Sequence, residues 1–483
     1  MKNTTKHHLL IGDSTKANKI LEMPNIDLLV TSPPYFNAPF DYDELFENYE
    51  TFLEMMHNFA KLYFKALKPG GIVGLNIDDM LIKGVKYPII SDSIKIFTTN
   101  GYELRGKIIW KKPEGYIRIS RRSGVLLQNP YPMYYYPDNL LECILVFQKP
   151  SQMKAKSEKM ISLEDIWEMT NVLPLKGRLE TDIAAFPDEL PKRLINFFTR
   201  KEAWVCDPFL GSGTTMKVAR ELKRNSIGIE ILNSLIPVIR KKTGFSSENL
   251  TSYLNSDQLI VEYLQNDNHT EENYNSIRNS HHSLLSQALK EYSSTNNYKY
   301  HLLLLNCRNT PLTVLNENFS LRIDGLYPGR ILAVLYESTN SGSFLTLNQL
   351  SDYVMNHGLH FRDKITIQHH PDKQWEVNTQ FKSKIVFNHC YYEILLFQKG
   401  KFNYKSRSKQ EKEDCLIDKR KFQREKWYLT LWDFRNHSRE ECDPIVVRRL
   451  LELFLFNNEL VGTNIAHVSC PKRQFNLDFF NQL

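Results

Sequence analysis

The stretch VCDPFLGSGTTMKVARELKRNSIGIEI, residues Val205–Ile231, decides the predicted fold. It begins as an apolar strand, turns through Gly211 and Gly213, and enters a helix at Thr214. Glycines suit such a turn because a Cβ would keep a ligand from lying against the backbone. A tight turn with only a structural role is the alternative. The strand–turn–helix–strand unit favours an α/β fold with a ligand site at the strand ends.

Two acidic residues frame this turn. Asp207 ends the strand before the glycines, and Glu230 ends the next strand, where a carboxylate can accept both hydroxyls of a ribose. A phosphate-binding loop is the rival interpretation, but no lysine follows the glycines in the required GK[ST] arrangement. The two acids therefore predict a site for a nucleoside without phosphates.

The rest of residues 1–244 alternates short apolar runs with helical periods, which is the α/β pattern. The runs expected as buried parallel strands are His8–Gly12, Asp27–Ser32, Gly71–Ile77, Leu104–Trp110, Cys143–Gln148, Trp204–Phe209 and Ser226–Ile231. The expected helices are roughly Asp43–Leu67, Tyr87–Asn100, Pro187–Thr199, Thr214–Lys223 and Ser234–Lys242.

Composition sets further limits on the class of protein. The chain has 483 residues, more than one ordinary hydrophobic core supports, so we expect two domains. Hydrophobic residues make up 42%, which excludes a disordered chain, and the net charge of +7 permits a polyanionic partner without requiring one. Seven scattered cysteines without zinc-ligand spacing indicate reduced thiols and no metal site. The lack of a signal segment or a long apolar run predicts a cytoplasmic protein without a membrane partner.

The second half of the chain contains a repeat of the first. Residues 245–300 hold no Gly or Pro and few apolar residues, which predicts a polar connector. Beyond it, four short segments of the first half recur in the same order, which favours duplication over the alternative of convergent patterning. The pairs are Leu67–Ile72 with Leu326–Ile331, Cys143–Lys149 with Glu393–Lys399, Asp165–Met169 with Thr430–Phe434, and Lys192–Phe198 with Arg448–Phe454.

A second motif, TSPPY at Thr31–Tyr35, follows an expected strand directly. Two consecutive prolines end a strand because they lack N–H donors, and they leave carbonyl groups facing outward. Ser32 before them and Tyr35 after them complete a rigid corner rich in acceptors. A bare turn is the alternative, but the carboxyl end of a strand is where α/β sheets bind ligands, so the position favours a functional site.

TSPPY together with DPFLGSGTT resembles the amino-directed DNA methyltransferases that use S-adenosylmethionine. The catalytic motif precedes the cofactor loop, an order similar to that of the β class. The resemblance covers residues 7–243 and implies a Rossmann-like α/β domain with a mixed, mostly parallel sheet. The repeat predicts that a degenerate second methyltransferase-like α/β domain follows it. Supporting motifs are GDS (Gly12–Ser14), LKPGG (Leu67–Gly71), IIWKKP (Ile108–Pro113) and FPDELPKRLI (Phe186–Ile195).

The resemblance implies roles position by position. The catalytic tetrapeptide corresponds to Ser32, Pro33, Pro34 and Tyr35. The site for the cofactor S-adenosylmethionine, with no metal, corresponds to Asp13, Phe186, Pro187, Asp207, Phe209, Gly211, Gly213, Thr214 and Glu230. Within that set Glu230 is the ribose acid, Asp13 lies near the adenine, and the Phe186–Pro187 segment closes over the methionine end.

The chemistry of methyl transfer suits these residue types. An exocyclic base amine is a poor nucleophile, so acceptors at Ser32 Oγ and the Pro33 carbonyl would hold its hydrogens while the lone pair attacks the methyl group in line. The base must first flip out of the duplex, and Tyr35 can stack on it. Carbon-5 methylation is disfavoured because it needs a cysteine nucleophile, and no cysteine follows a proline in this chain.

The first letter of the tetrapeptide bears on the target base. In the resembled family SPPY usually accompanies N4-cytosine enzymes, whereas DPPY and NPPY usually accompany N6-adenine enzymes. With Ser32 in that position we expect cytosine N4 as the target and keep adenine N6 as the alternative. An RNA methyltransferase and a DNA-binding scaffold without activity are further alternatives.

A basic segment is expected to contact the nucleic acid. Arg105–Arg122 holds seven basic residues against one acidic residue, and tyrosines follow it, which suits phosphate and base contacts within a target-recognition segment of about 105–140. A solvated charged hairpin is the alternative. The expected DNA contacts are Lys111, Lys112, Arg118, Arg121 and Arg122. The expected partner is double-stranded DNA, and the restriction–modification setting implied by the family adds a cognate restriction endonuclease as a functional partner.

The second copy lacks the chemistry of the first. Leu302–Thr313 leads to the second LYPG without an SPPY, and the best counterpart of the cofactor loop, Leu460–His467, has one glycine and no DPF. A fused nuclease using Asp363 and Lys364 is less favoured, because FRDKITIQ matches LRGKIIW. The expected division is a catalytic domain at 1–244, a polar connector at 245–300 and a non-catalytic repeat at 301–483.

Overall fold

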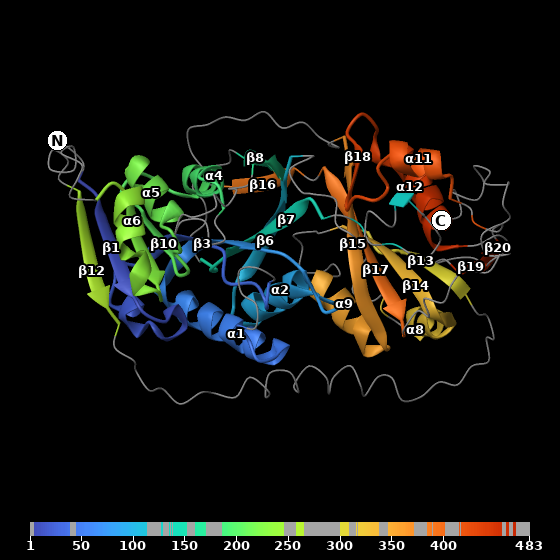
Figure 1. Ribbon diagram of the computed structural model, residues 1–483, viewed down its shortest axis with the longest axis horizontal. Helices are drawn as coiled ribbons and strands as arrows, with labels where there is room; N and C mark the ends of the chain where they lie inside the picture. The colour runs from blue at the N-terminus through green and yellow to red at the C-terminus, as the bar shows by residue number, and fades with distance from the viewer. Residues whose placement is uncertain are drawn as a thin grey trace.

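The computed structural model describes most of the chain in segments separated by gaps. These segments are 4–38, 45–113, 127–128, 135, 137, 139–151, 160–170, 186–245, 257–264, 300–308, 315, 317–337, 346–370, 384–388, 390–400, 415, 417–455, 460–462 and 467–469. Within them the chain forms two mixed β-sheets with helices packed on their faces (Figure 1).

The first sheet has nine strands among the described residues, in the order β12-β1-β11-β10-β2-β3-β7-β6-β9. All neighbouring strands run parallel except at β7, which is antiparallel to both β3 and β6. The bounds are β1 (Lys6–Ile11), β2 (Ile26–Thr31), β3 (Leu67–Ile77), β6 (Glu103–Lys111), β7 (Leu141–Gln148), β9 (Ile166–Glu168), β10 (Trp204–Asp207), β11 (Asn225–Glu230) and β12 (Gln258–Tyr263).

Helices cover both faces of this sheet because its central strands are apolar on both sides. Leu29 packs with α1 and α2 on one face, whereas its neighbours Leu28 and Val30 pack with α4 and α5 on the other. Among the described residues, no helix is long and apolar enough to cross a membrane. The helices are α1 (Tyr49–Ala66), α2 (Ile89–Thr99), α4 (Glu189–Phe198), α5 (Thr214–Glu221) and α6 (Ile236–Lys242), with short 3₁₀ turns η1 (Ser14–Lys16), η2 (Asn18–Leu21) and η4 (Asn233–Leu235).

The second sheet has seven strands among the described residues, in the order β18-β15-β17-β14-β13-β19-β20. Its strands are β13 (Tyr300–Asn306), β14 (Leu326–Tyr336), β15 (Leu359–His369), β17 (Tyr391–Lys399), β18 (Leu431–Phe434), β19 (Leu460–Gly462) and β20 (His467–Ser469). Its helices are α8 (Glu317–Asp324), α9 (Leu347–Asn356), α11 (Lys419–Arg424) and α12 (Arg439–Phe454). The predicted fold class, a mixed and mostly parallel α/β sheet followed by a second α/β part, is confirmed.

The structure differs from the sequence predictions in two places. The run Cys143–Gln148 lies in β7 and is antiparallel, because an apolar run fixes burial and not strand direction. Part of the predicted connector 245–300 forms β12, which pairs with β1 at the edge of the first sheet. The other connector residues from 246 to 256 and from 265 to 299 lie outside the described residues.

The two sheets lie side by side, with α2 and α9 packed against each other between them (Figure 1). One apolar cluster runs without a break from α1 and α2 of the first part to α9 and β14 of the second. Two small sheets also form, a hairpin of β4 (Met80–Ile82) with β5 (Val85–Tyr87) and a parallel pair of β8 (Met160–Glu164) with β16 (Lys384–Asn388). The second pair joins one part to the other.

Candidate functional site

The serine–proline–proline–tyrosine corner begins where β2 ends. Thr31 is the last residue of the strand, and Tyr35 turns its hydroxyl back toward the ends of two neighbouring strands. That hydroxyl donates to Glu142 at 3.1 Å and accepts from Asn76 at 2.9 Å. Ser32 Oγ lies within 3.5 Å of the Tyr35 hydroxyl and 3.4 Å of the Asn76 amide, so the corner is held by one polar network.

Glu142 is the centre of that network. One carboxylate oxygen accepts from Asn76 at 2.8 Å, and the other pairs with Lys112 at 2.5 Å. Burial and the nearby Glu142 charge raise the pKa of Tyr35 well above its ordinary value, so the phenol stays protonated and acts as a donor. Asn76 and Glu142 were not singled out in the sequence. The signal that could have marked Asn76 is a polar residue near the carboxyl end of an otherwise apolar strand.

The glycine turn lies one strand away from this corner. It joins β10 to α5, and both Gly211 (φ 55°) and Gly213 (φ 93°) have a left-handed backbone. A Cβ on Gly213 would approach Ile239 to 3.3 Å, so a side chain there is disfavoured by conformation and by space. Lys242 donates to the hydroxyls of Ser212 and Thr214, each at 2.7 Å, and fixes the turn from α6.

Asp207 joins the glycine turn to the corner. Its carboxylate is 2% exposed and accepts from the Thr31 hydroxyl at 2.7 Å, the Thr215 hydroxyl at 2.6 Å and the Phe209 amide at 3.2 Å. Burial raises the pKa of Asp207 to about 6, although the three hydrogen bonds oppose that rise. Because Thr31 directly precedes Ser32, this single carboxylate fixes both motifs relative to each other.

Glu230 ends β11 and faces the same edge of the sheet. Its two carboxylate oxygens accept from the amides of Gly211 at 2.8 Å and Leu232 at 2.9 Å, and burial raises its pKa. Its carbonyl accepts from the Gly12 amide at 2.9 Å, which brings Asp13 to the same edge. Asp13 caps the turn η1 through the Thr15 amide and hydroxyl.

The remaining predicted cofactor residues lie around this edge. Phe209 packs edge-on against Phe59 of α1, with ring centroids 5.4 Å apart. Phe186 is buried in the apolar cluster under α4, and the carbonyl of Pro187 accepts from the Leu190 amide at the start of that helix. The structure therefore brings the predicted cofactor residues and the tetrapeptide to the carboxyl ends of β1, β2, β10 and β11, and to the segment before α4.

The predicted DNA-contact residues divide into two groups. Lys111 pairs with Glu168 at 3.4 Å and Lys112 pairs with Glu142 at 2.5 Å, with side chains that are 9% and 13% exposed. These lysines thus face carboxylates of their own chain. Arg118, Arg121 and Arg122 lie outside the described residues. Among the residues that the structure describes, no His, Cys, Asp and Glu cluster is arranged to hold a metal ion.

Comparisons with known proteins give the family. The family model of the N6/N4 DNA methylases, described as DNA methylase, matches residues 26–241. The type II methyltransferase M.MjaI of Methanocaldococcus jannaschii is 34% identical over 292 residues, which cover 51% of this chain and 94% of that protein. M.MthZI of Methanothermobacter thermautotrophicus is 32% identical over 278 residues, covering 49% and 76%.

A solved structure is similar at lower sequence identity. The PvuII DNA methyltransferase (cytosine-N4-specific) is 21% identical and aligns with 53% of this chain and 96% of its own, at a TM-score of 0.40. The family match, and the similarity to M.MjaI over 94% of that protein, lead to one conclusion. The chain belongs to the N6/N4 DNA methylase family.

Proposed function

We propose that the chain is a site-specific DNA methyltransferase that transfers a methyl group from S-adenosylmethionine to the N4 amine of a cytosine flipped out of duplex DNA. The observation that carries this proposal is the bond from Thr31 to Asp207, because it joins the tetrapeptide to the glycine turn. A donor site and an acceptor-rich corner are thereby held beside each other at one edge of the sheet. The serine in the first position of the tetrapeptide favours cytosine.

The residues at the glycine turn fit the methyl donor. A nucleoside needs close approach to a backbone without side chains, which Gly211 and Gly213 provide, and a carboxylate for the ribose hydroxyls, which Glu230 provides. The donor would supply an electrophilic methyl group on a sulfonium. Asp13 would lie toward the adenine, and Phe186 with Pro187 toward the methionine end.

The corner supplies the acceptors that the target amine needs. Ser32 Oγ and the Pro33 carbonyl would accept the two amine hydrogens, which frees the nitrogen lone pair from the ring for in-line attack. Tyr35 would stack on the flipped base. Its hydroxyl is fixed by Glu142 and Asn76, so the ring is positioned before the base arrives.

The proposal extends to the biological setting and to the division of the chain. Duplex DNA is the substrate, and Arg118, Arg121 and Arg122 of the target-recognition segment remain the proposed phosphate contacts. The family suggests a restriction–modification system with a cognate endonuclease. Residues 1–244 form the proposed catalytic domain, to which β12 adds an edge strand, and residues 301–483 form a non-catalytic repeat.

Mass spectrometry of nucleosides tests the target base. DNA without methylation is incubated with the purified chain and S-adenosylmethionine, digested and analysed. We expect N4-methylcytosine, and we expect a Pro33→Ala variant to lose it while keeping the wild-type melting temperature to within a few degrees. N6-methyladenine in its place would replace cytosine with adenine as the target. Full methyl transfer by the Pro33→Ala variant would overturn the assigned corner.

A further inference from the structure

The two sheets repeat one plan strand by strand. β9-β6-β7-β3-β2-β10 and β18-β15-β17-β14-β13-β19 follow the same order, and each strand pair has the same direction as its counterpart. Even the registers agree. Leu28 lies opposite Ile72 and Leu302 lies opposite Ile331, after a register shift at the same point of each pair. Residues of these six strands thus have defined equivalents in the other half.

Side-chain bonds are duplicated along with the strands. At the end of β7 the Gln148 amide donates to the Gly70 carbonyl at 3.0 Å, and at the end of β17 Gln398 donates to Gly329 at 3.2 Å. The lysine that follows each glutamine donates to carbonyls where a helix ends. That helix is α1, before β3, in the first half and α8, before β14, in the second. Such agreement assigns equivalents residue by residue.

Helices α2 and α9 are equivalents of each other, and they are in contact. Each is followed by a left-handed glycine, Gly101 (φ 94°) or Gly358 (φ 76°). Lys95 and Asp352 each precede that glycine by the same number of residues, and their charged groups pair at 2.7 Å. A two-fold axis brings an element beside it into contact with its own equivalent, and the pair of Lys95 with Asp352 fits an approximate axis of this kind between them.

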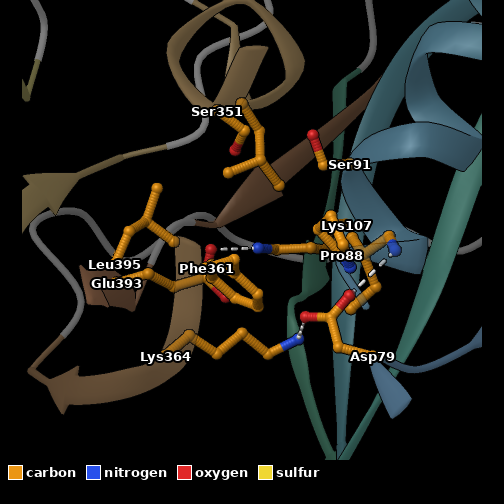
Figure 2. A pocket seen from close by; sticks show the side chains of 11 residues that line it. Asp79, Pro88, Ser91, Lys107, Ser351, Phe361, Lys364, Glu393 and Leu395 are labelled. Atoms are coloured by element: carbon orange, nitrogen blue, oxygen red, sulfur yellow. Dashed lines mark hydrogen bonds and ion pairs between the residues drawn. The ribbon is translucent and has the colours of Figure 1, made fainter. Parts of the chain in front are cut away.

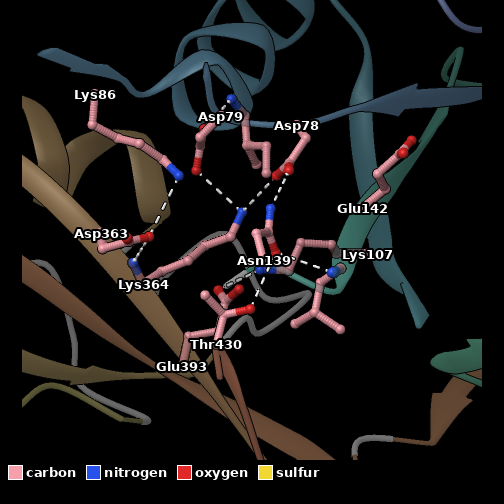
Figure 3. Close-up of polar contacts among 12 residues, drawn as sticks. Asp78, Asp79, Lys86, Lys107, Asn139, Glu142, Asp363, Lys364, Glu393 and Thr430 are labelled. Carbon is pink, nitrogen blue, oxygen red and sulfur yellow. Dashed lines mark hydrogen bonds and ion pairs between the residues drawn. The ribbon is translucent and has the colours of Figure 1, made fainter. Parts of the chain in front are cut away.

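Buried charges cross this axis in both directions. Lys107 of β6 pairs with Glu393 of the second half, and its equivalent Lys364 of β15 pairs with Asp79 at 3.1 Å and Asp78 at 3.4 Å of the first half (Figure 3). Burial alone would lower the pKa of Lys364, but the two aspartates raise it, so the ammonium stays charged. Figure 2 shows the small cavity between the halves, lined by both lysines.

Segments of the two halves also contact each other in both directions. The segment before β17 forms β16, which pairs with β8, the segment before β9. The reciprocal contact comes from Tyr135, in the segment before β7. Its hydroxyl donates to the carbonyl of Leu429, just before β18, at 3.3 Å. Reciprocal contacts of equivalent segments are those of an isologous dimer.

In the second half, an ion pair joins the positions that are equivalent to the candidate site of the first half. After β13, in the position of the tetrapeptide, stands Arg308, which donates two hydrogen bonds to Asp443 at 3.0 and 2.6 Å. Tyr392, the equivalent of Glu142, donates to the same carboxylate at 2.8 Å and lies 4.7 Å under the guanidinium. Asp443 occupies the position equivalent to Pro187. The bidentate pair therefore joins the position equivalent to the tetrapeptide to the position equivalent to Pro187.

Residues of the second half also contact the residues that lie beside Asn76 and Glu142, the two partners of Tyr35. Asp78, which Lys364 binds, follows the strand that carries Asn76. The Asn139 amide donates to Asp78 at 2.6 Å, its carbonyl accepts from the Thr430 hydroxyl at 3.1 Å, and Asn139 leads into the strand that carries Glu142 (Figure 3). Both partners of Tyr35 are therefore anchored by residues of the second half.

We propose that the chain is a dimer built within one polypeptide, in which the second half is a partner subunit that performs no transfer and positions the catalytic corner of the first half through Lys364 and Thr430. The number of S-adenosylmethionine sites per chain in this proposal rests on the proposed function. The two-fold axis and the closed second site do not rest on it. One chain then carries one working site.

Charge exchange at Lys95 and Asp352 tests the axis on the full chain without reference to activity. We expect Lys95→Asp and Asp352→Lys each to lower the melting temperature by about 1–3 °C, since each puts like charges at the axis. The double variant Lys95→Asp/Asp352→Lys should recover most of that loss. A double variant whose loss equals the sum of the two single losses would overturn the axis.

Steady-state kinetics test the positioning role. We expect Lys364→Met to lower kcat about tenfold with the KM for S-adenosylmethionine unchanged, whereas Lys95→Asp, which loosens the same interface away from the corner, keeps the wild-type kcat. Because Lys364 is buried, Thr430→Val is the milder second variant, with the same direction expected. Wild-type kcat in both Lys364→Met and Thr430→Val would overturn the positioning role.

Calorimetric titration with S-adenosylhomocysteine counts the sites. One equivalent per chain is expected, and two equivalents would overturn the closed second site. Absence of any binding would instead overturn the proposed function, and the charge exchange would still decide the axis.

Discussion

Replacement of Glu142 by glutamine tests how the proposed catalytic corner, Ser32–Tyr35, is held in place. The carboxylate is 17% exposed and touches three partners, accepting from Tyr35 at 3.1 Å and Asn76 at 2.8 Å and pairing with Lys112 at 2.5 Å. Glutamine keeps the shape of the side chain and one acceptor oxygen. It removes the charge and leaves Lys112 without its carboxylate.

The expected loss follows from the kind of bond that is removed. A hydrogen bond to a charged group contributes about 1.5–3 kcal/mol, and a largely buried lysine deprived of its partner adds to the loss of stability. If the bond to Tyr35 positions the ring for the transition state, the same free energy corresponds to a fall in kcat of about 10- to 100-fold. The KM for the methyl donor should not change, because Glu230 and the glycine turn do not contact Glu142.

The assay is transfer of a radiolabelled methyl group to DNA, with melting temperature measured in parallel. The second half offers a matched control in Tyr392→Phe. Tyr392 occupies the position equivalent to Glu142, and the substitution removes the hydrogen bond from its hydroxyl to the Asp443 carboxylate. We expect Tyr392→Phe to lower stability by about 1–2 kcal/mol and to keep the wild-type kcat. A wild-type kcat for Glu142→Gln, or an equal loss in both variants, would refute the positioning of Tyr35 by Glu142.

Three further predictions concern stability. Asp207 holds a proton in the folded state up to a pKa of about 6 that the unfolded chain releases near 3.8, so the wild type loses up to about 3 kcal/mol as pH rises between these values. Urea unfolding at pH 4 and pH 7 should therefore show Asp207→Asn gaining on the wild type at pH 7, and a constant difference would contradict the pKa. Gly213→Ala should lower stability in thermal melting by about 1 kcal/mol or more beyond the effect of Gly84→Ala. Both glycines have a left-handed backbone (φ 93° and 89°), but only a Cβ on Gly213 would meet a neighbour. Arg308→Met should lower the free energy of unfolding by about 2 kcal/mol and leave methyl transfer unchanged, and a gain of a second donor site or a loss of activity would count against its structural role.

The sequence predicts the first sheet well where burial dominates. Runs such as Asp27–Ser32 are apolar on both faces, and the structure places them in the centre of the sheet. It misses β12, because Gln258–Tyr263 is a half-exposed edge strand within a polar segment. The direction of β7 was not predictable either, because the same apolar run satisfies a parallel or an antiparallel neighbour.

The site divides along similar lines. Asp207 and Glu230 stand at the ends of recognisable motifs, so local sequence was enough to single them out. Asn76 and Glu142 belong to no motif and meet only when β3 pairs with β7, although they are 66 residues apart. The basic and aromatic pattern around Lys111 and Lys112 predicts DNA contacts, but such a pattern does not reveal the carboxylates that the fold places opposite the two lysines.

The pair at the approximate axis has a consequence for how such a chain could have diverged. In a dimer of identical chains, a residue on the axis meets its own copy, and every substitution is felt twice. Lys95 opposite Asp352 is an arrangement that two identical halves cannot make, because they would bring lysine to lysine or aspartate to aspartate. Once both halves share one polypeptide, each is free to change alone. Opposite charges then favour pairing of the two unlike halves and disfavour pairing of like halves. The asymmetry of the interface therefore keeps the half with the proposed site together with the half that lacks the tetrapeptide.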